Sequence, residues 1–212
     1  HIRLRNPDAV MWLLRLKHVD QYSFDHAMDV SVNLLLFGTH IGFRGQRLLD
    51  LGVAGMLQDV GKTQLSSEVL AKTGDLTPEE QHQVRSHVAS SLEILMLQQS
   101  LSREILYVVA RHHERWDGGG YPRGLRGEDI PLSARIVAIC DVYDALRMPR
   151  PYKQAWSSER ARSYIREQSG QHFDPALVAV VEQLFDAIDA LQQEFDDAGA
   201  AADLESMGSV ES

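Results

Sequence analysis

A set of histidine and aspartate side chains lies beside apolar residues on segments that read as helices, and such a set can bind metal ions. Aspartates are rarely buried unless they are paired or bound to a metal, and each aspartate of the set ends or interrupts an apolar run. Mixed imidazole and carboxylate ligation suits Fe, Mn, Zn or Co better than Ca or Mg. Two such metals about 3.5–4 Å apart can activate hydroxide and stabilise a phosphoryl oxygen. The set consists of His26, Asp59, His87, His112, His113 and Asp141.

Two further stretches carry residues suited to a phosphate or nucleotide ligand. In HHERWDGGGYPRGLRGEDIP, residues 112–131, the glycines can bring the backbone close to a ligand. In DVYDALRMPRPYK, residues 141–153, Arg147, Arg150 and Lys153 place cations suited to a phosphate or a guanine face. Each feature alone has a simpler explanation: a helix stop and turn, cations that complement a helix dipole, or hydrogen-bonded histidines and solvated aspartates. The prediction of a site therefore depends on the features together.

The elements that must position these side chains are almost all helices. Thr77-Pro78-Glu79-Glu80 is typical of a capping box with proline at the first helical position. No stretch shows the sustained two-residue alternation of strands, and no repeat of 20–50 residues is present. The sequence predicts one all-α domain over residues 1–195 and an acidic, disordered tail over residues 196–212. The expected helices cover about 7–18, 24–42, 45–57, 67–74, 78–98, 103–116, 132–147, 158–169 and 175–195.

Composition limits the classes of function. The chain has 212 residues and a net charge of −9, so nucleic-acid binding through a broad basic surface is excluded, whereas a local cationic pocket for a compact anion is not. Cys140 is the single cysteine, which fits a reducing compartment. The longest apolar runs are too short to cross a bilayer, and the start lacks a signal-peptide pattern. We therefore expect a cytoplasmic fragment of a longer protein, with no DNA or RNA partner and no membrane segment in this fragment.

The motifs resemble those of one family. HHERWDGGGYP resembles the HHE-x-x-DGxGYP signature of the HD-GYP domain, a branch of the HD phosphohydrolase superfamily. IPLSARIVAICDVYDAL followed by RPYK is similar to the family's next block, and the motif order agrees over roughly residues 7–190. The resemblance implies a single HD-type helical bundle with a metal site between helices. It also implies hydrolysis of the second messenger cyclic di-GMP to pGpG or GMP.

The resemblance assigns roles to individual residues. It implies two divalent ions, most often Fe or Mn with Zn, Co or Ni as other options, and an interaction of the GYP surface with diguanylate cyclase domains. It makes Asp59 a bridging and catalytic carboxylate and Lys62 a catalytic cation that stabilises phosphate charge. The implied metal ligands are His26, Asp59, His87, His112, His113 and Asp141. The implied nucleotide contacts are Gly120, Tyr121, Pro122, Arg150 and Lys153.

Two positions depart from the family pattern. Tyr22 stands where members with a third metal carry glutamate, so a third metal is not expected. Gln58 replaces the histidine of the His-Asp doublet, and a glutamine carbonyl is a weaker ligand for borderline metals than imidazole. We therefore expect Gln58 to be a weak ligand or none, with one metal site depleted and catalysis reduced or absent.

The departure at Gln58 leaves alternatives open. One is a weakened cyclic di-GMP phosphodiesterase. Another is a degenerate module that binds cyclic di-GMP or a partner protein without turnover. A third is a phosphohydrolase for another nucleotide, against which the GYP loop argues.

Overall fold

The chain folds as a bundle of helices. The computed structural model describes residues 7–98, 101–149 and 154–194. Within these ranges there is no strand, only an isolated bridge between Ser169 and Phe173. The all-α prediction is therefore confirmed. The division into a domain over residues 1–195 and a tail over residues 196–212 remains a prediction, because both ends of the chain lie outside the described residues.

The helices follow one another with short connections. Side chains cap the starts of α5, α7, α9 and α10, and the capping box at Thr77 is present as predicted. Residues 185–194 form a further helical stretch. The elements are α1 Pro7–Val19, α2 Gln21–His40, α3 Gly45–Leu57, the 3₁₀ turn η1 Val60–Gln64, α4 Ser67–Leu70, α5 Pro78–Arg85, α6 His87–Met96, α7 Arg103–Val109, the 3₁₀ turn η2 Gly127–Asp129, α8 Leu132–Arg147, α9 Ser158–Glu167 and α10 Pro175–Val181.

Several expected helices are divided or end earlier than the sequence predicts. The segment 78–98 is divided at Ser86, which ends α5 and precedes α6. The segment 103–116 is helical only to Val109, so His112 and His113 lie in the turn after α7 rather than on the helix. The last expected helix is interrupted by a turn at residues 182–184. The first two breaks lie beside the candidate ligands His87, His112 and His113.

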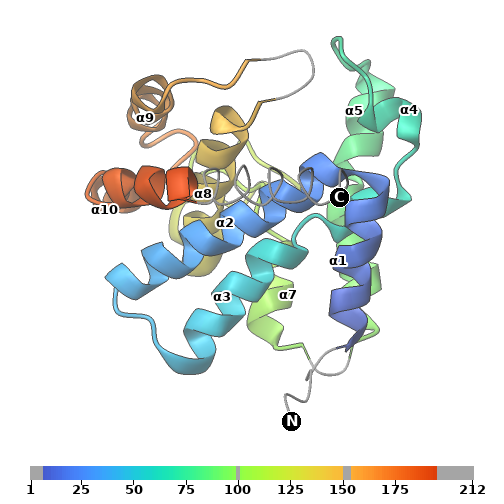
Figure 1. Ribbon diagram of the computed structural model, residues 1–212, viewed down its shortest axis with the longest axis horizontal. Coiled ribbons are helices and arrows are strands. Elements are labelled where there is room, and N and C mark those ends of the chain that lie inside the picture. The colour runs from blue at the N-terminus through green and yellow to red at the C-terminus, as the bar shows by residue number, and fades with distance from the viewer. Residues whose placement is uncertain (1–6, 99–100, 150–153, 195–212) are drawn as a thin grey trace, which may run out of the picture.

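The core is organised around α2. Figure 1 shows α2 running across the middle of the molecule, with α3 beside it and α8 behind. Val30, Leu34 and Phe37 of α2 are fully buried in this core. Further contacts join α3 to α7, η1 to α6, and α8 to α9. The end of α3, the start of α6 and the middle of α8 thereby meet at one place.

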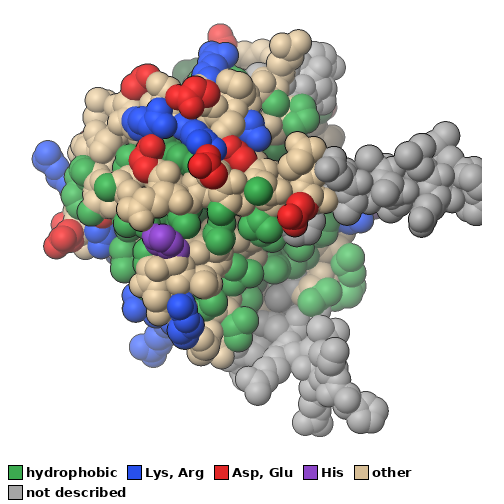
Figure 2. All heavy atoms as spheres, turned by 60° about the vertical axis from the view of Figure 1, so that its left-hand side comes forward, with side chains coloured by type: hydrophobic (Ala, Val, Ile, Leu, Met, Phe, Trp, Pro, Cys, Tyr) green, Lys and Arg blue, Asp and Glu red, His purple; other side chains and the backbone are tan. Residues whose placement is uncertain are grey.

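Charges of both signs alternate on the side that carries α9 and α10. Figure 2 shows Lys and Arg side chains intermixed with Asp and Glu on this face. Arg162 pairs with Asp186 and Asp189 at 2.8 and 2.6 Å, and Arg166 pairs with Glu182 at 2.9 Å. This face therefore offers no broad basic area for a nucleic-acid backbone.

None of the helices in the described ranges has both the length and the apolar character needed to cross a membrane.

Candidate metal centre

The Gln58–Asp59 doublet is held by contacts between the end of α3 and α6. Both residues are buried, in the turn between α3 and η1. The Ser91 hydroxyl on α6 donates to the Gln58 carbonyl at 2.9 Å and accepts from the Gly61 amide at 2.8 Å. The end of a helix leaves carbonyls without intrahelical partners, and Ser91 satisfies one of them. The doublet is thereby fixed in position relative to α6.

His87 and His112 use the same local device. The Nδ1 atom of His87 lies 2.6 Å from the Val84 carbonyl, and Nδ1 of His112 lies 2.8 Å from the Val109 carbonyl. In each case the carbonyl belongs to the end of a helix, three residues earlier in the chain. A carbonyl can only accept, so Nδ1 donates and the neutral ring presents a lone pair on Nε2. Backbone bonds of this kind commonly orient metal-ligating histidines.

Three acceptor atoms converge, one from Asp59 of the doublet and one each from His87 and His112. The Nε2 atoms of His87 and His112 lie 3.4 Å apart. Asp59 Oδ1 lies 3.1 Å from the first and 3.9 Å from the second, and it is buried without a hydrogen bond of normal geometry. Burial lowers the pKa of His112, and it lowers that of His113 well below its usual range, so both rings favour the neutral form. Buried acceptors facing one another fit a divalent cation.

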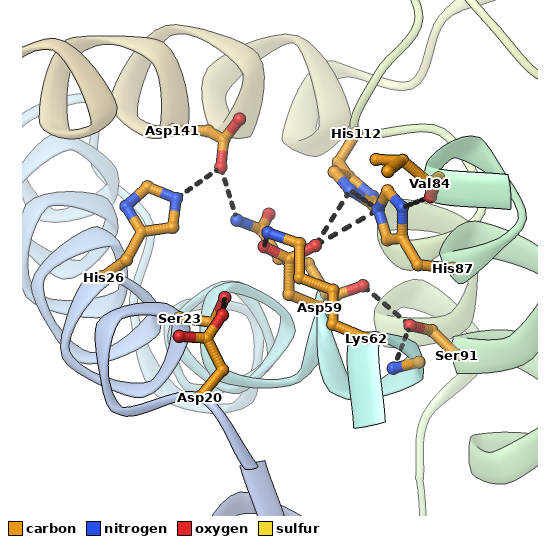
Figure 3. A network of polar contacts seen from close by, with 12 residues as sticks. Asp20, Ser23, His26, Asp59, Lys62, Val84, His87, Ser91, His112 and Asp141 are labelled. Carbon is orange, nitrogen blue, oxygen red and sulfur yellow. Dashed lines mark hydrogen bonds and ion pairs between the residues drawn. The ribbon is translucent and has the colours of Figure 1, made fainter. Parts of the chain in front are cut away.

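The predicted ligands are brought together in two overlapping groups. Asp59, His87, His112 and His113 form the first, and the second joins Asp59 to His26 and Asp141; potential ligand atoms within each lie within 4.8 Å of one another. Figure 3 shows Asp59 between the His26–Asp141 pair and the His87–His112 pair. Asp59 belongs to both groups, which is the position that a bridging carboxylate requires.

The second group is closed by direct hydrogen bonds. His26 Nε2 lies 3.0 Å from Asp141 Oδ1, and His26 Nδ1 lies 2.6 Å from Asp144 Oδ2. The Gln58 amide Nε2 donates to the same Asp141 Oδ1 at 2.8 Å. Burial alone would lower the pKa of His26, but hydrogen bonds to Asp141 and Asp144 raise it well above its usual range. Gln58 thus faces the site with a donor rather than a ligand atom.

Lys62 binds the other oxygen of the shared carboxylate. Its Nζ lies 2.7 Å from Asp59 Oδ2, and about a fifth of its side chain is exposed (21%). Burial alone would raise the pKa of Asp59, but the Lys62 ammonium holds it well below its usual range. Burial alone would likewise lower the pKa of Lys62, and Asp59 raises it instead. The pair is therefore an ammonium beside a carboxylate.

The GYP loop folds back onto the histidine pair. The Tyr121 ring centroid lies 4.7 Å from that of His113, and the Tyr121 amide donates to the His113 carbonyl at 3.2 Å. A Cβ atom on Gly120 would lie 2.4 Å from the Arg115 amide nitrogen, so only glycine fits there. Pro122 follows within the same loop. The loop thus borders the first group of ligands.

Two predicted nucleotide contacts have no described position. Arg150 and Lys153 lie outside the described residues. Tyr22, at the position of the third-metal glutamate, stacks at 6.2 Å on His26. Its aromatic ring adds no carboxylate to the second group.

The structure also adds residues that the sequence did not indicate. Asp144 orients His26 and accepts from Gln192 Nε2 at 3.1 Å; its place three residues after Asp141 on a helix could have indicated it. Buried Glu114 accepts from the amides of Arg123 and Leu125 at 2.8 and 2.9 Å and thereby holds the GYP loop. Glu114 is the glutamate of the HHE signature, to which the sequence analysis assigned no role.

Arg85 is a third residue of this kind. Its guanidinium carbon lies 5.0 Å from the Tyr121 ring centroid, and its side chain is exposed. It follows Val84, whose carbonyl holds His87, so it borders the ligand cluster. Nothing in the sequence distinguished it from other surface arginines.

Comparisons with known proteins agree with this arrangement. A model of the HD domain family matches residues 18–177. A cyclic di-GMP phosphodiesterase of Pseudomonas aeruginosa is 38% identical over 172 residues, which cover 81% of this chain and 41% of the relative. A 3′3′-cGAMP-specific phosphodiesterase of Vibrio cholerae is 40% identical over 145 residues, which cover 68% and 28%. The chain thus spans less than half the length of these curated relatives.

Solved structures share the fold. A cyclic GMP-AMP specific phosphodiesterase of V. cholerae superposes with a TM-score of 0.63 at 21% identity, covering 84% of this chain and 48% of the other. An HDGYP protein of Bdellovibrio bacteriovorus gives a TM-score of 0.61 at 18% identity, covering 77% and 51%. These likenesses show the helical architecture, and the family model and the curated relatives show the family. The chain therefore belongs to the HD domain family, within its HD-GYP branch.

Proposed function

We propose that this chain is a metal-dependent phosphodiesterase domain that hydrolyses cyclic di-GMP to pGpG or GMP, with turnover weakened by Gln58. The observation that carries the proposal is the convergence of Asp59 Oδ1 with Nε2 of His87 and of His112, buried and facing one another. A divalent cation satisfies such a set of atoms. The names of the curated relatives support a cyclic dinucleotide as the substrate class.

The chain's own residues would hold the phosphodiester for attack by water. Lys62 Nζ, 2.7 Å from Asp59 Oδ2, places a fixed positive charge where charge develops on the phosphate. Tyr121 offers an aromatic ring beside His113 for a guanine base. In the reaction a bond forms between water oxygen and phosphorus, the P–O3′ bond breaks, and the 3′ oxygen takes up a proton. Bound metal would supply Lewis-acid stabilisation of a phosphoryl oxygen and lower the pKa of water.

The identity and number of the metals are part of the proposal. The imidazole-rich group around Asp59 suits Fe or Mn, and Zn, Co or Ni are also compatible with nitrogen and carboxylate ligands. His26 and Asp141 would contribute to a second position that Gln58 weakens. Arg150 and Lys153 remain proposed nucleotide contacts. We also propose a cytoplasmic location, which would keep the buried Cys140 reduced.

A second candidate function is binding without turnover. The hydrogen bond from Gln58 to Asp141 favours it, because it replaces a predicted imidazole ligand by a donor. Such a module would still bind cyclic di-GMP through the Asp59–His87–His112 cluster and the Tyr121 loop. The same loop is the surface that we propose for diguanylate cyclase domains.

Turnover by the wild type and by Gln58→His separates the two functions. We expect slow cleavage of cyclic di-GMP by protein reconstituted with Mn(II) or Fe(II), and a gain of about 10–100-fold in Gln58→His, because an imidazole ligand is restored. Product formation is followed by chromatography, with 3′3′-cGAMP as a second substrate. Gln46→His, an exposed change at the other end of α3, is the control and should gain nothing.

Each outcome decides between the functions. Binding of cyclic di-GMP without cleavage, with cleavage restored in Gln58→His, establishes the second function. If neither the wild type nor Gln58→His binds or cleaves any cyclic dinucleotide, both functions are rejected.

Arg85→Ala should raise KM for cyclic di-GMP about 10-fold and leave kcat nearly unchanged, since an exposed guanidinium beside Tyr121 can bind a phosphate at the mouth of the site. Arg85→Lys should recover part of the loss, and metal content should stay constant in both variants. The control is Arg103→Ala, because Arg103 begins α7 at the end opposite to His112. An unchanged KM, or a parallel loss of metal, would assign Arg85 to loop stability alone.

A further inference from the structure

The two groups of candidate ligands differ in whether their polar atoms have donors. We call Asp59, His87, His112 and His113 the Asp59 half, and His26, Gln58 and Asp141 the His26 half. In the Asp59 half, acceptors face acceptors: the Nε2 atoms of His87 and His112 are 3.4 Å apart, and Asp59 Oδ1 is 3.1 Å from the nearer one. In the His26 half, Asp141 Oδ1 lies against two nitrogens, His26 Nε2 at 3.0 Å and Gln58 Nε2 at 2.8 Å. The halves therefore need a cation to different degrees.

Among the described residues, no donor reaches Asp59 Oδ1 with hydrogen-bond geometry. The Nδ1 atoms of His87 and His112 are committed to the carbonyls of Val84 and Val109, so the Nε2 atoms present lone pairs. Lone pairs at these distances in a buried setting repel one another unless a cation lies between them. The Asp59 half is thus suited to a divalent ion.

The His26 half is already satisfied by direct contacts. Asp141 Oδ1 accepts from Gln58 Nε2 at 2.8 Å and lies 3.0 Å from His26 Nε2. Asp59 Oδ2, the other carboxylate oxygen of the shared residue, is bound by Lys62 Nζ at 2.7 Å. Figure 3 shows these contacts around the Asp141 and Asp59 side chains. A second cation held by His26, Asp141 and the shared Asp59 would have to displace the hydrogens that Gln58 donates to Asp141 and that Lys62 donates to Asp59.

The amide orientation of Gln58 follows from the same contacts. Its Oε1 is buried without a hydrogen-bond partner among the described residues, and this is the one atom with which Gln58 could ligate. Turning the amide by 180° would place Oε1 against Asp141 Oδ1, two acceptors at hydrogen-bond distance. A neutral amide oxygen is also a weaker ligand than imidazole for these metals. The donor orientation is therefore the stable one.

We propose that the chain holds one divalent cation, in the Asp59 half, and that Gln58 closes the His26 half by hydrogen bonds in place of a second cation. This proposal rests on the metal centre of the proposed function and specifies its stoichiometry. It makes Lys62, rather than a second metal, the other positive charge beside Asp59. It also gives both buried aspartates, Asp59 and Asp141, a partner in a chain that has Gln58 in place of the doublet histidine.

The first test is the number of bound ions. Protein reconstituted with Mn(II) and freed of excess metal by gel filtration should contain one Mn per chain, by elemental analysis, and show the EPR spectrum of an isolated Mn(II). Gln58→His should contain two and show an exchange-coupled pair. Two ions per chain in the wild type, a coupled spectrum, or no retained Mn would overturn the proposal.

The second test removes one side chain from each half. His112→Ala should lose its Mn, whereas His26→Ala should keep about one per chain. Gln58→Leu keeps the size of the side chain but removes the amide. It should also keep one Mn per chain and melt at a lower temperature than the wild type. This variant keeps the test valid if His26→Ala does not fold. Loss of Mn from Gln58→Leu would make Gln58 a ligand and reject the proposal.

Metal content and catalysis are recorded separately. One Mn per chain with no cleavage of cyclic di-GMP upholds the single-cation centre and rejects the enzymatic function. Two Mn per chain with cleavage of cyclic di-GMP rejects the single-cation centre and upholds the enzymatic function.

Discussion

Asp59→Asn should lose bound metal and lower turnover of cyclic di-GMP by more than about 100-fold, since even residues that only support a ligand typically contribute about 10–100-fold. Asp59 Oδ1 faces the Nε2 atoms of His87 and His112, and Oδ2 binds Lys62 at 2.7 Å. A neutral amide supplies a weaker ligand and leaves the ammonium without its counter-charge. The unpaired Lys62 should also reduce the free energy of unfolding by about 1–3 kcal/mol.

Metal content by elemental analysis, initial rates and thermal melts check the prediction. Asp50→Asn is the matched control, because Asp50 is likewise a buried aspartate but lies within α3, where it accepts from Gln46 at 2.7 Å. It should lower stability without changing metal content. If Asp59→Asn keeps its metal and its rate, Asp59 has neither the ligand role nor the shared position that we assign to it.

The candidate ligands, whose proximity the structure shows, could be singled out in the sequence because their signals are local. A histidine or aspartate beside an apolar run, and the HHE-to-GYP spacing, are visible without knowledge of distant contacts. Packing of α2, α3 and α8 then brings the distant members together, as expected for a helical bundle. The helix boundaries were harder to predict. Ser86 separates α5 from α6 with no glycine or proline to indicate a break.

The orientation of the Gln58 amide could not be predicted from the sequence, for a different reason. Its donor contact is with Asp141, 83 residues away, and a glutamine can present either an oxygen or an NH₂ group. Residue type alone indicated a weak ligand, whereas the structure presents a donor. Asp144 lay within reach of sequence reasoning, since it follows Asp141 by three residues on α8.

Gly61→Ala should destabilise the domain by about 1–3 kcal/mol or more and weaken metal binding with it. The sequence shows only a glycine before Lys62, but the structure shows why a side chain cannot fit. A Cβ atom would lie 2.1 Å from the His87 carbonyl oxygen and 2.5 Å from the Ser91 amide nitrogen. These are backbone atoms of α6, so η1 must move away from α6. The Gly61–Ser91 hydrogen bond would lengthen, and Asp59 and Lys62 would move with η1.

Thermal melts and Mn(II) titration check this prediction, with Gly74→Ala as the control because no atom lies within 4 Å of a Cβ there. A loss of 1 kcal/mol lowers Tm by about 2–4 °C in a domain of this size, and Gly74→Ala should leave Tm unchanged or slightly higher. Combining Gly61→Ala with Ser91→Ala separates the two contacts. Removing the Ser91 hydroxyl cannot relieve a clash with backbone, so the double variant should melt no higher than Gly61→Ala alone. Recovery of Tm in the double variant would instead locate the strain in the Ser91 side chain, and the backbone contact between η1 and α6 would then not be what requires glycine before Lys62.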